Sequence, residues 1–294
     1  MAAYLETATT TGRRFALQIL FVPFTARSRN HIVSTLRFLS RALRVICHLA
    51  LALLLCVIIN LDFTGKVDAD DWSRRWLKRL MRIMGIRFVV HGKPLAGGQM
   101  IVCNHVSWID IPLVGAALSS RFVAKSEIQH WPLIGFIARA IGTFFIRRGV
   151  GGSKPLLEKL KPHLNQSGAV VVFPEGTTTD GHDVLPFHPR LFQAALDCKA
   201  IVQPVALRYG LNPAGEDIAP FIGDDTLFAH VARMLKSPGL TAELFYCAPL
   251  RPEHYADRAT LARDAEQAIR RLVAPAVSFK KPALLERQAH ARAA

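Results

Sequence analysis

Short apolar runs alternate with amphipathic stretches along most of the chain after residue 86. The runs have the length of buried strands, and the stretches repeat their apolar residues at helical spacing. The pattern predicts strands at 99–103, 169–173, 201–207 and 240–247, and helices at 190–198, 227–235 and 257–273. Because strands and helices alternate, we expect an α/β fold with a largely parallel central sheet flanked by helices.

The first 85 residues have a different pattern, which predicts helices that dock on a membrane. Residues 45–59 are the strongest apolar run, but 15 residues are fewer than the roughly 20 that cross a bilayer. A half-inserted or re-entrant helix is therefore favoured, with a full span or a buried core helix as alternatives. Residues 72–84 place Trp72 and Trp76 on one helical face and arginines across from them. This is typical of an interfacial helix, or of a surface helix packed on the domain.

Residues 15–24 form a further apolar stretch, which follows Arg13 and Arg14. The arrangement resembles a twin-arginine secretion signal, but no small-residue cleavage site follows it, and a membrane-surface helix is the preferred interpretation. These patterns divide the chain into a membrane-associated helical region at 1–85, a domain at 86–280 and a frayed tail at 281–294.

Composition and charge also favour a membrane surface. The 294 residues are 51% hydrophobic and carry a net charge of +15, and residues 1–92 hold 14 Lys/Arg against 5 Asp/Glu. Such an apolar content excludes a disordered chain, and the shortness of the apolar runs excludes a multi-spanning transporter. Basic charge beside apolar helices favours anionic membrane lipids as partners over nucleic acid, which is a distant alternative.

The five cysteines are scattered, and no pair of them has the CxxC spacing of a zinc site. We therefore expect no metal site and a reducing compartment, the cytoplasm. Arg41 and Arg44 precede the apolar run and would hold its N-terminal side in the cytoplasm. The prediction is a monotopic or re-entrant protein on the cytoplasmic face of the inner membrane.

Candidate chemistry begins where the predicted strand at 99–103 ends. His105 follows this strand, and α/β folds place functional groups at the carboxyl ends of their strands. Asp110 comes five residues later, in the predicted first turn of a helix, from which its carboxylate can return to the imidazole. A carboxylate on one ring nitrogen leaves the other nitrogen free to take a proton from a hydroxyl.

A second motif follows the predicted strand at 169–173. Its residues are Pro174, Glu175, Gly176, Thr177 and Thr178. Glycine allows close backbone approach, and exposed amides together with threonine hydroxyls can hold an oxyanion or a polar head group.

Together the two motifs resemble those of the lysophospholipid acyltransferase family. The family's NHxxxxD box matches Asn104, His105 and Asp110, and its FPEGT box matches residues 173–177. Residues 142–148 resemble the block that lies between them, and residues 202–207 resemble the block that follows. The resemblance covers roughly residues 70–250.

The resemblance implies acyl transfer without a covalent enzyme intermediate. His105 would be the general base on an acceptor hydroxyl, and Asp110 would orient it and stabilise its charge. The acyl donor would be an acyl-coenzyme A or acyl-acyl carrier protein thioester, and no bound cofactor or metal is implied. The residues that would contact the polar head of the lysophospholipid acceptor are Lys125, Arg148, Glu175, Gly176, Thr177 and Thr178.

The sequence departs from the family at one position. The family usually has an arginine after FPEGT as a phosphate ligand, and this chain has Thr178. A hydroxyl donates one hydrogen bond and carries no charge, so either Arg190 replaces the missing cation or the acceptor lacks a phosphate.

Two acceptors remain open at this point. The preferred function is the acylation of 1-acyl-glycerol-3-phosphate to phosphatidic acid, a step of phospholipid biosynthesis. The alternative is O-acylation of lyso-ornithine lipid or another lysophospholipid, since the FPEGTT variant resembles lyso-ornithine lipid acyltransferases and a subset of bacterial lysophosphatidate acyltransferases. A non-catalytic lipid-binding protein is a distant alternative, because such a relative would lack His105 or Asp110 and both are present.

Overall fold

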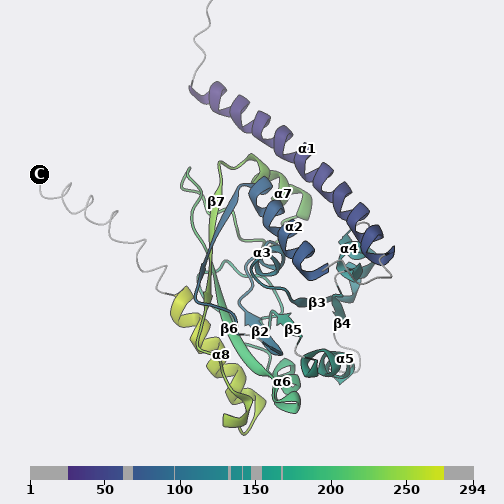
Figure 1. Ribbon diagram of the computed structural model, residues 1–294. Coiled ribbons are helices and arrows are strands. Elements are labelled where there is room, and N and C mark those ends of the chain that lie inside the picture. Colours follow the sequence, from purple (N-terminus) through teal and green to yellow (C-terminus); the bar gives the residue numbers. More distant parts are fainter. Residues whose placement is uncertain are drawn as a thin grey trace, which may run out of the picture.

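The computed structural model describes residues 26–61, 69–95, 97–131, 134–140, 142–146, 154–166 and 168–274. The helix predicted at 15–24 and the tail predicted at 281–294 lie outside these residues. Helices cover both sides of a central sheet (Figure 1). In chain order the elements are α1 (Ala26–Leu61), α2 (Ala69–Met84), β1 (Ile86–His91), β2 (Gln99–Cys103), α3 (Asp110–Ala117), β3 (Arg121–Lys125), η1 (Ser126–His130), α4 (Ile134–Ala140), β4 (Phe144–Ile146), α5 (Lys154–Asn165), β5 (Ala169–Val172), η2 (Pro189–Phe192), α6 (Gln193–Cys198), β6 (Ile201–Tyr209), α7 (Leu227–Lys236), β7 (Leu240–Tyr246), η3 (Pro252–His254) and α8 (Arg258–Val273).

Seven strands form one sheet in the order β1-β7-β6-β2-β5-β3-β4. Neighbouring strands are parallel except for β6 and β7, which are antiparallel, so β7 and β1 run opposite to the other five. The predicted α/β class with a largely parallel sheet is confirmed. The carboxyl ends of β6, β2, β5, β3 and β4 share one edge of the sheet, which we call the carboxyl edge.

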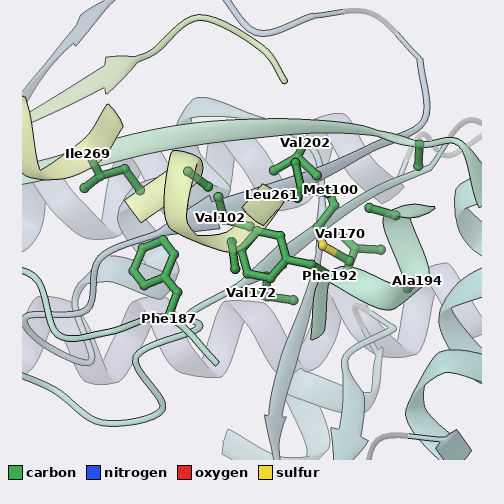
Figure 2. Close-up of a cluster of buried hydrophobic side chains, with 14 of the residues drawn as sticks. Met100, Val102, Val170, Val172, Phe187, Phe192, Ala194, Val202, Leu261 and Ile269 are labelled. Atoms are coloured by element: carbon green, nitrogen blue, oxygen red, sulfur yellow. The ribbon is translucent and has the colours of Figure 1, made fainter. Parts of the chain in front are cut away.

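The central strands are buried on both faces, because successive side chains of a strand point to opposite sides. On one side, Met100 and Val102 of β2 join Val170 and Val172 of β5 in a core that is covered by α5, α6, η2 and α8 (Figure 2). Phe192 of η2 is the largest fully buried side chain in this core. It fixes the segment that leads from β5 back to the start of β6.

On the other side of the sheet, Ile101 of β2 faces a second core that includes α2, α3 and α7. Met81, Leu113 and Met234, one from each of these helices, are buried there. The apolar face of α2 is therefore used inside the protein, where it packs on α3 and α1. This corresponds to the surface-helix alternative from the sequence, although Trp72 stays 44% exposed.

Helix α1 is longer than the apolar run at 45–59 predicts, because it continues without a break over 36 residues. At 1.5 Å per residue its length is about 54 Å. Its segment Asn30–Leu55 has the length and hydropathy of a membrane span, and 11% of its most apolar window is buried in the protein. One side of α1 packs on α2, α7 and α4, so the helix lies across the domain (Figure 1).

Polar contacts fix this placement of α1. Arg37 and Arg41 donate hydrogen bonds to the backbone carbonyl groups of 235–237, at the carboxyl end of α7. Cations are favoured at this end of a helix, where its dipole is negative. Further along α1, the ring of His48 stacks on Trp76 of α2 with the ring centroids 4.5 Å apart.

Candidate active site

Residues that the sequence singles out gather at the carboxyl edge of the sheet. His105 follows β2, Glu175 follows β5, and Lys125 ends β3. These three strands are neighbours, and strands lie about 4.8 Å apart, so the line of β3 is about 10 Å from that of β2. Arg148 comes two residues after β4, the next strand along this edge, and lies outside the described residues.

The imidazole of His105 and the carboxylate of Asp110 are in direct contact, as their spacing predicts. Asp110 is the first residue of α3, and its Oδ2 lies 2.7 Å from Nδ1 of His105. An ionised carboxylate only accepts hydrogen bonds, so Nδ1 carries a proton, and in the neutral imidazole Nε2 is then the nitrogen with the lone pair. No group among the described residues bonds to Nε2, and the His105 side chain is 18% exposed. His105 therefore presents a ring nitrogen without a protein partner among the described residues, in a side chain that is partly exposed.

The carboxylate of Asp110 is fully buried and surrounded by hydrogen-bond donors. Besides His105, its Oδ2 accepts from the backbone N–H groups of Val106 at 2.7 Å and Ser107 at 2.9 Å. Its Oδ1 accepts from the hydroxyl of Tyr209 at 2.6 Å. These donors satisfy both oxygens of a carboxylate that is buried away from solvent. Sequence reasoning missed Tyr209, which comes here because it ends β6, the strand beside β2.

Two further contacts fix the loop after β2. The side-chain amide of Asn104 donates to the carbonyl of Leu207 and accepts from the N–H of Leu207, so it continues the pairing of β2 with β6 beyond the end of β2. Phe173 stacks on the imidazole of His105, with the ring centroids 4.2 Å apart. The ring of His105 is therefore supported by packing as well as by Asp110.

Trp108 anchors the same loop on α7. Its indole N–H donates to Nδ1 of His230 at 3.0 Å, and Nε2 of His230 lies 3.1 Å from the carbonyl oxygen of Pro220. Accepting at Nδ1 and donating at Nε2 requires a neutral imidazole, and burial lowers the pKa of His230. No local sequence pattern indicates this contact, because His230 is 122 residues from Trp108.

The loop after β5 begins with a tight turn that positions Glu175. The Phe173 carbonyl accepts from the N–H of Gly176, and Gly176 has a φ of +73°, a value that favours glycine. Glu175 is 4% exposed, and its carboxylate accepts from the N–H groups of His105 at 2.6 Å and Leu185 at 2.8 Å. Burial raises the pKa of Glu175 to about 7, against these two donors, which lower it. Glu175 thus joins its own loop to the backbone of His105.

The threonines after this turn differ in their surroundings. The hydroxyl of Thr178 donates to the carbonyl of Phe221, whereas Thr177 is exposed. Of the residues that the resemblance assigns to the acceptor's head group, Glu175 and Thr178 therefore bind protein groups in this structure.

The two predicted cations within the described residues lie in different places. Lys125 is exposed at the carboxyl edge. Arg190 is exposed in η2, a segment that packs through Phe192 on one face of the sheet. Among the described residues, no hydrogen bond or ion pair joins Arg190 to the two motifs. The structure therefore places Lys125 at the carboxyl edge, and Arg190 two residues after His188, whose N–H donates to the Pro174 carbonyl of the second motif.

Comparisons with known proteins extend the similarity beyond these motifs. Residues 86–208 match the family model for "Acyltransferase". The chain is 38% identical over 243 residues to a lyso-ornithine lipid O-acyltransferase from Pseudomonas aeruginosa, which covers 81% of this chain and 94% of that protein. It is 34% identical over 178 residues to a 1-acyl-sn-glycerol-3-phosphate acyltransferase from Neisseria gonorrhoeae, which covers 60% of this chain and 70% of that protein.

The fold is similar to that of a solved structure. This is the crystal structure of the 1-acyl-sn-glycerophosphate acyltransferase PlsC from Thermotoga maritima, with a TM-score of 0.65 and 22% sequence identity. The match covers 86% of this chain and 98% of that one. At this identity the likeness concerns the fold alone.

Proposed function

The chain belongs to the acyltransferase family, and on that premise we propose that it moves a fatty acyl group from a thioester donor to the hydroxyl of a membrane lyso-lipid. The observation that carries this proposal is the contact of His105 with Asp110, which leaves one ring nitrogen free at the carboxyl edge. Acyl transfer to a hydroxyl needs a group that removes a proton and then returns it to the leaving sulfur. A histidine in this position does both.

In the proposed reaction, Nε2 of His105 takes the proton of the acceptor hydroxyl while the oxygen attacks the thioester carbonyl carbon. The tetrahedral intermediate then breaks its C–S bond, and the leaving sulfur takes the proton from His105 to become a thiol. The products are an ester and free coenzyme A or acyl carrier protein. Asp110 stays ionised and stabilises the imidazolium that exists between the two proton transfers.

We place lyso-ornithine lipid first among the acceptors, which reverses the preference drawn from the sequence alone. The relative from Pseudomonas aeruginosa, which matches over most of both chains, is a lyso-ornithine lipid O-acyltransferase. In addition, the position after FPEGT offers no charge to a phosphate, because it is Thr178 and its hydroxyl binds the carbonyl of Phe221. The second candidate is 1-acyl-glycerol-3-phosphate, which the relative from Neisseria gonorrhoeae and the exposed Lys125 favour.

The function is tested by an acyl-transfer assay on the detergent-solubilised full chain. Lyso-ornithine lipid and 1-acyl-glycerol-3-phosphate are offered in parallel, each with an acyl-coenzyme A and with an acyl-acyl carrier protein, and His105→Ala is the control. We expect faster turnover of lyso-ornithine lipid, lost in the variant. Turnover of the phosphate acceptor alone would reverse the order of acceptors, and no transfer to either would overturn acyl transfer as the function.

We also propose that the protein docks on the cytoplasmic face of the membrane without crossing it. One side of α1 packs along α2 and α7, which carry many charged residues, so a spanning α1 would draw those charges into hydrocarbon. The other side of α1 suits burial in one leaflet, with basic residues near anionic head groups. It carries exposed apolar side chains at helical spacing, namely Ile32, Leu36, Leu39, Leu43, Ile46, Leu54 and Val57.

The double variant Leu43→Glu, Ile46→Glu tests this docking face, since each of the two side chains is 64% exposed. We expect co-flotation with phosphatidylglycerol vesicles to fall at least about tenfold, because each side chain contributes up to about 1.5–3 kcal/mol when buried. The matched control is Gln166→Glu, Gln267→Glu, which adds the same charge at exposed positions and should float like the wild type. Unchanged flotation of the α1 variant would contradict this placement.

A further inference from the structure

The two oxygens of the Asp110 carboxylate have unequal sets of donors. Oδ2 accepts three hydrogen bonds, from His105 and from two backbone N–H groups. Among the described residues, Oδ1 accepts one, from the hydroxyl of Tyr209 at 2.6 Å. Because Asp110 is fully buried, water does not offer Oδ1 an alternative partner. Tyr209 is therefore the donor that the described residues supply on this side of the carboxylate.

Tyr209 is placed so that it supplies a neutral donor. It is the last residue of β6, and the neighbouring strand β2 leads into the His105 loop. Its ring packs against the core on the side of α2, α3 and α7. Burial, together with the charge of Asp110, raises the pKa of Tyr209 well above its usual range. The hydroxyl therefore keeps its proton and donates it to Oδ1.

We propose that Tyr209 is a positioning residue for acyl transfer, which holds Asp110 in the orientation that aligns the ring of His105. The Cβ–Cγ torsion of an aspartate is broad, so contacts at Oδ2 alone define the plane of the carboxylate loosely. A short hydrogen bond at Oδ1 fixes this plane from the opposite side and keeps Oδ2 in line with Nδ1 of His105. This inference rests on the proposed function, in which His105 is the general base.

The hydroxyl of Tyr209 also stabilises the negative charge of Asp110 through its hydrogen bond. Without this hydroxyl, the charge of the Asp110 carboxylate is less well stabilised, and it attracts a proton on His105 more strongly. His105 then stays protonated, and inactive as a base, up to a higher pH. Loss of the hydroxyl should therefore move the acid limb of the kcat/KM profile to higher pH and lower kcat through poorer alignment.

The first test compares two conservative variants of the full chain. Tyr209→Phe removes only the hydroxyl, and Tyr246→Phe is the matched control. Tyr246 lies on β7, beside β6, packs against the same core and is not a hydrogen-bond partner of Asp110. For Tyr209→Phe we expect kcat to fall about 10- to 30-fold with KM within about twofold, and the acid limb to rise by about 0.5 pH unit or more. Tyr246→Phe should keep the wild-type kcat and acid limb.

A second variant changes the strength of the donor and keeps the ring. In Tyr209→3-fluorotyrosine, introduced at this position alone, the hydroxyl is more acidic and donates a stronger hydrogen bond. The charge of Asp110 is then better stabilised, so we expect the acid limb to move to lower pH. This is the opposite of the movement expected for Tyr209→Phe. A role limited to packing predicts no movement in either direction.

The outcomes separate this proposal from the function on which it rests. Wild-type kcat and acid limb in Tyr209→Phe, with a stability loss like that of Tyr246→Phe, would overturn the positioning role. If Tyr209→Phe does not fold, an unmoved acid limb in the fluorotyrosine variant overturns it instead. Near wild-type activity in His105→Ala would overturn the proposed general base itself, whichever result Tyr209 gives.

Discussion

Two loops leave the carboxyl edge of the sheet side by side, and they use their polar side chains in different ways. They follow the paired strands β2 and β5. The loop after β2 presents His105 at the edge with Asp110 buried behind it. The loop after β5 is equally rich in polar groups, but Glu175 and Thr178 bind backbone groups of neighbouring segments.

Under the proposed function, the loop after β2 carries the reacting group and the loop after β5 holds it in place, and we call them the reacting loop and the holding loop. His105 has a ring nitrogen that no described residue binds and a side chain that solvent reaches. Glu175 is buried, and each of its oxygens accepts from a backbone N–H. This division predicts that Glu175 does not touch the substrate, because both of its oxygens already accept from protein donors. The predictions below test this division.

The largest effect is expected in the reacting loop. His105→Gln keeps a polar side chain but removes the group that accepts a proton, so kcat should fall by about 1000-fold. Because glutamine can still donate a hydrogen bond to Asp110 but loses the stacking on Phe173, the thermal midpoint should fall by no more than about 4 °C. Initial rates and circular-dichroism melts on the same preparation measure both quantities. A large drop in the midpoint would mean that the ring also has a structural role.

In the holding loop, stability should change before substrate binding does. Glu175→Gln turns one acceptor into a donor that faces a backbone N–H, either of His105 or of Leu185, and leaves that N–H unpaired. We expect the free energy of unfolding at pH 5 to fall by about 3 kcal/mol, measured by denaturant titration. The KM for the acceptor should stay within about twofold. A raised KM at unchanged stability would contradict the division, because Glu175 would then bind the acceptor's head group.

The pKa of Glu175, raised to about 7, makes the stability of the holding loop depend on pH. Its value in the unfolded chain is 4.5, so between these two values the folded state binds a proton that the unfolded state has lost. The stabilising contribution is complete below about pH 4.5 and is lost as the pH rises through 7. Relative to Glu175→Gln, the wild type should lose about 2 kcal/mol of unfolding free energy between pH 5 and pH 7. A constant difference between the two proteins would contradict a raised pKa.

The parts of the site that lie within one loop could be predicted from the sequence, and the parts that depend on strand order could not. His105 and Asp110 are five residues apart, so a strand end followed by a helix start is enough to predict their contact. Tyr209 is 99 residues from Asp110, and no local pattern records that β6 lies beside β2. The same holds for the contact of Glu175 with the backbone N–H of His105, 70 residues away.

The fold shows the same limit. The strands predicted from apolar runs are the buried central ones together with β7, whereas β1 is largely exposed and β4 has three residues, which leaves little pattern to detect. The apolar run at 45–59 predicts only part of α1, because arginines interrupt the apolar residues that precede it. Arg37 and Arg41 bind carbonyl groups of α7, so these charges are accommodated by the protein instead of ending the helix.

The smallest effect is expected at Thr178, where the holding loop touches the segment of Phe221. Thr178→Val keeps the shape of the side chain and removes the donor to the Phe221 carbonyl, so the free energy of unfolding should fall by about 1 kcal/mol. Thr177→Val, at the exposed neighbouring position, should change it by less than about 0.5 kcal/mol. Both variants should keep the preference between lyso-ornithine lipid and 1-acyl-glycerol-3-phosphate. If Thr178→Val altered this preference at unchanged stability, Thr178 would be a substrate contact. The loop after β5 would then bind the acceptor as well as hold the loop after β2 in place.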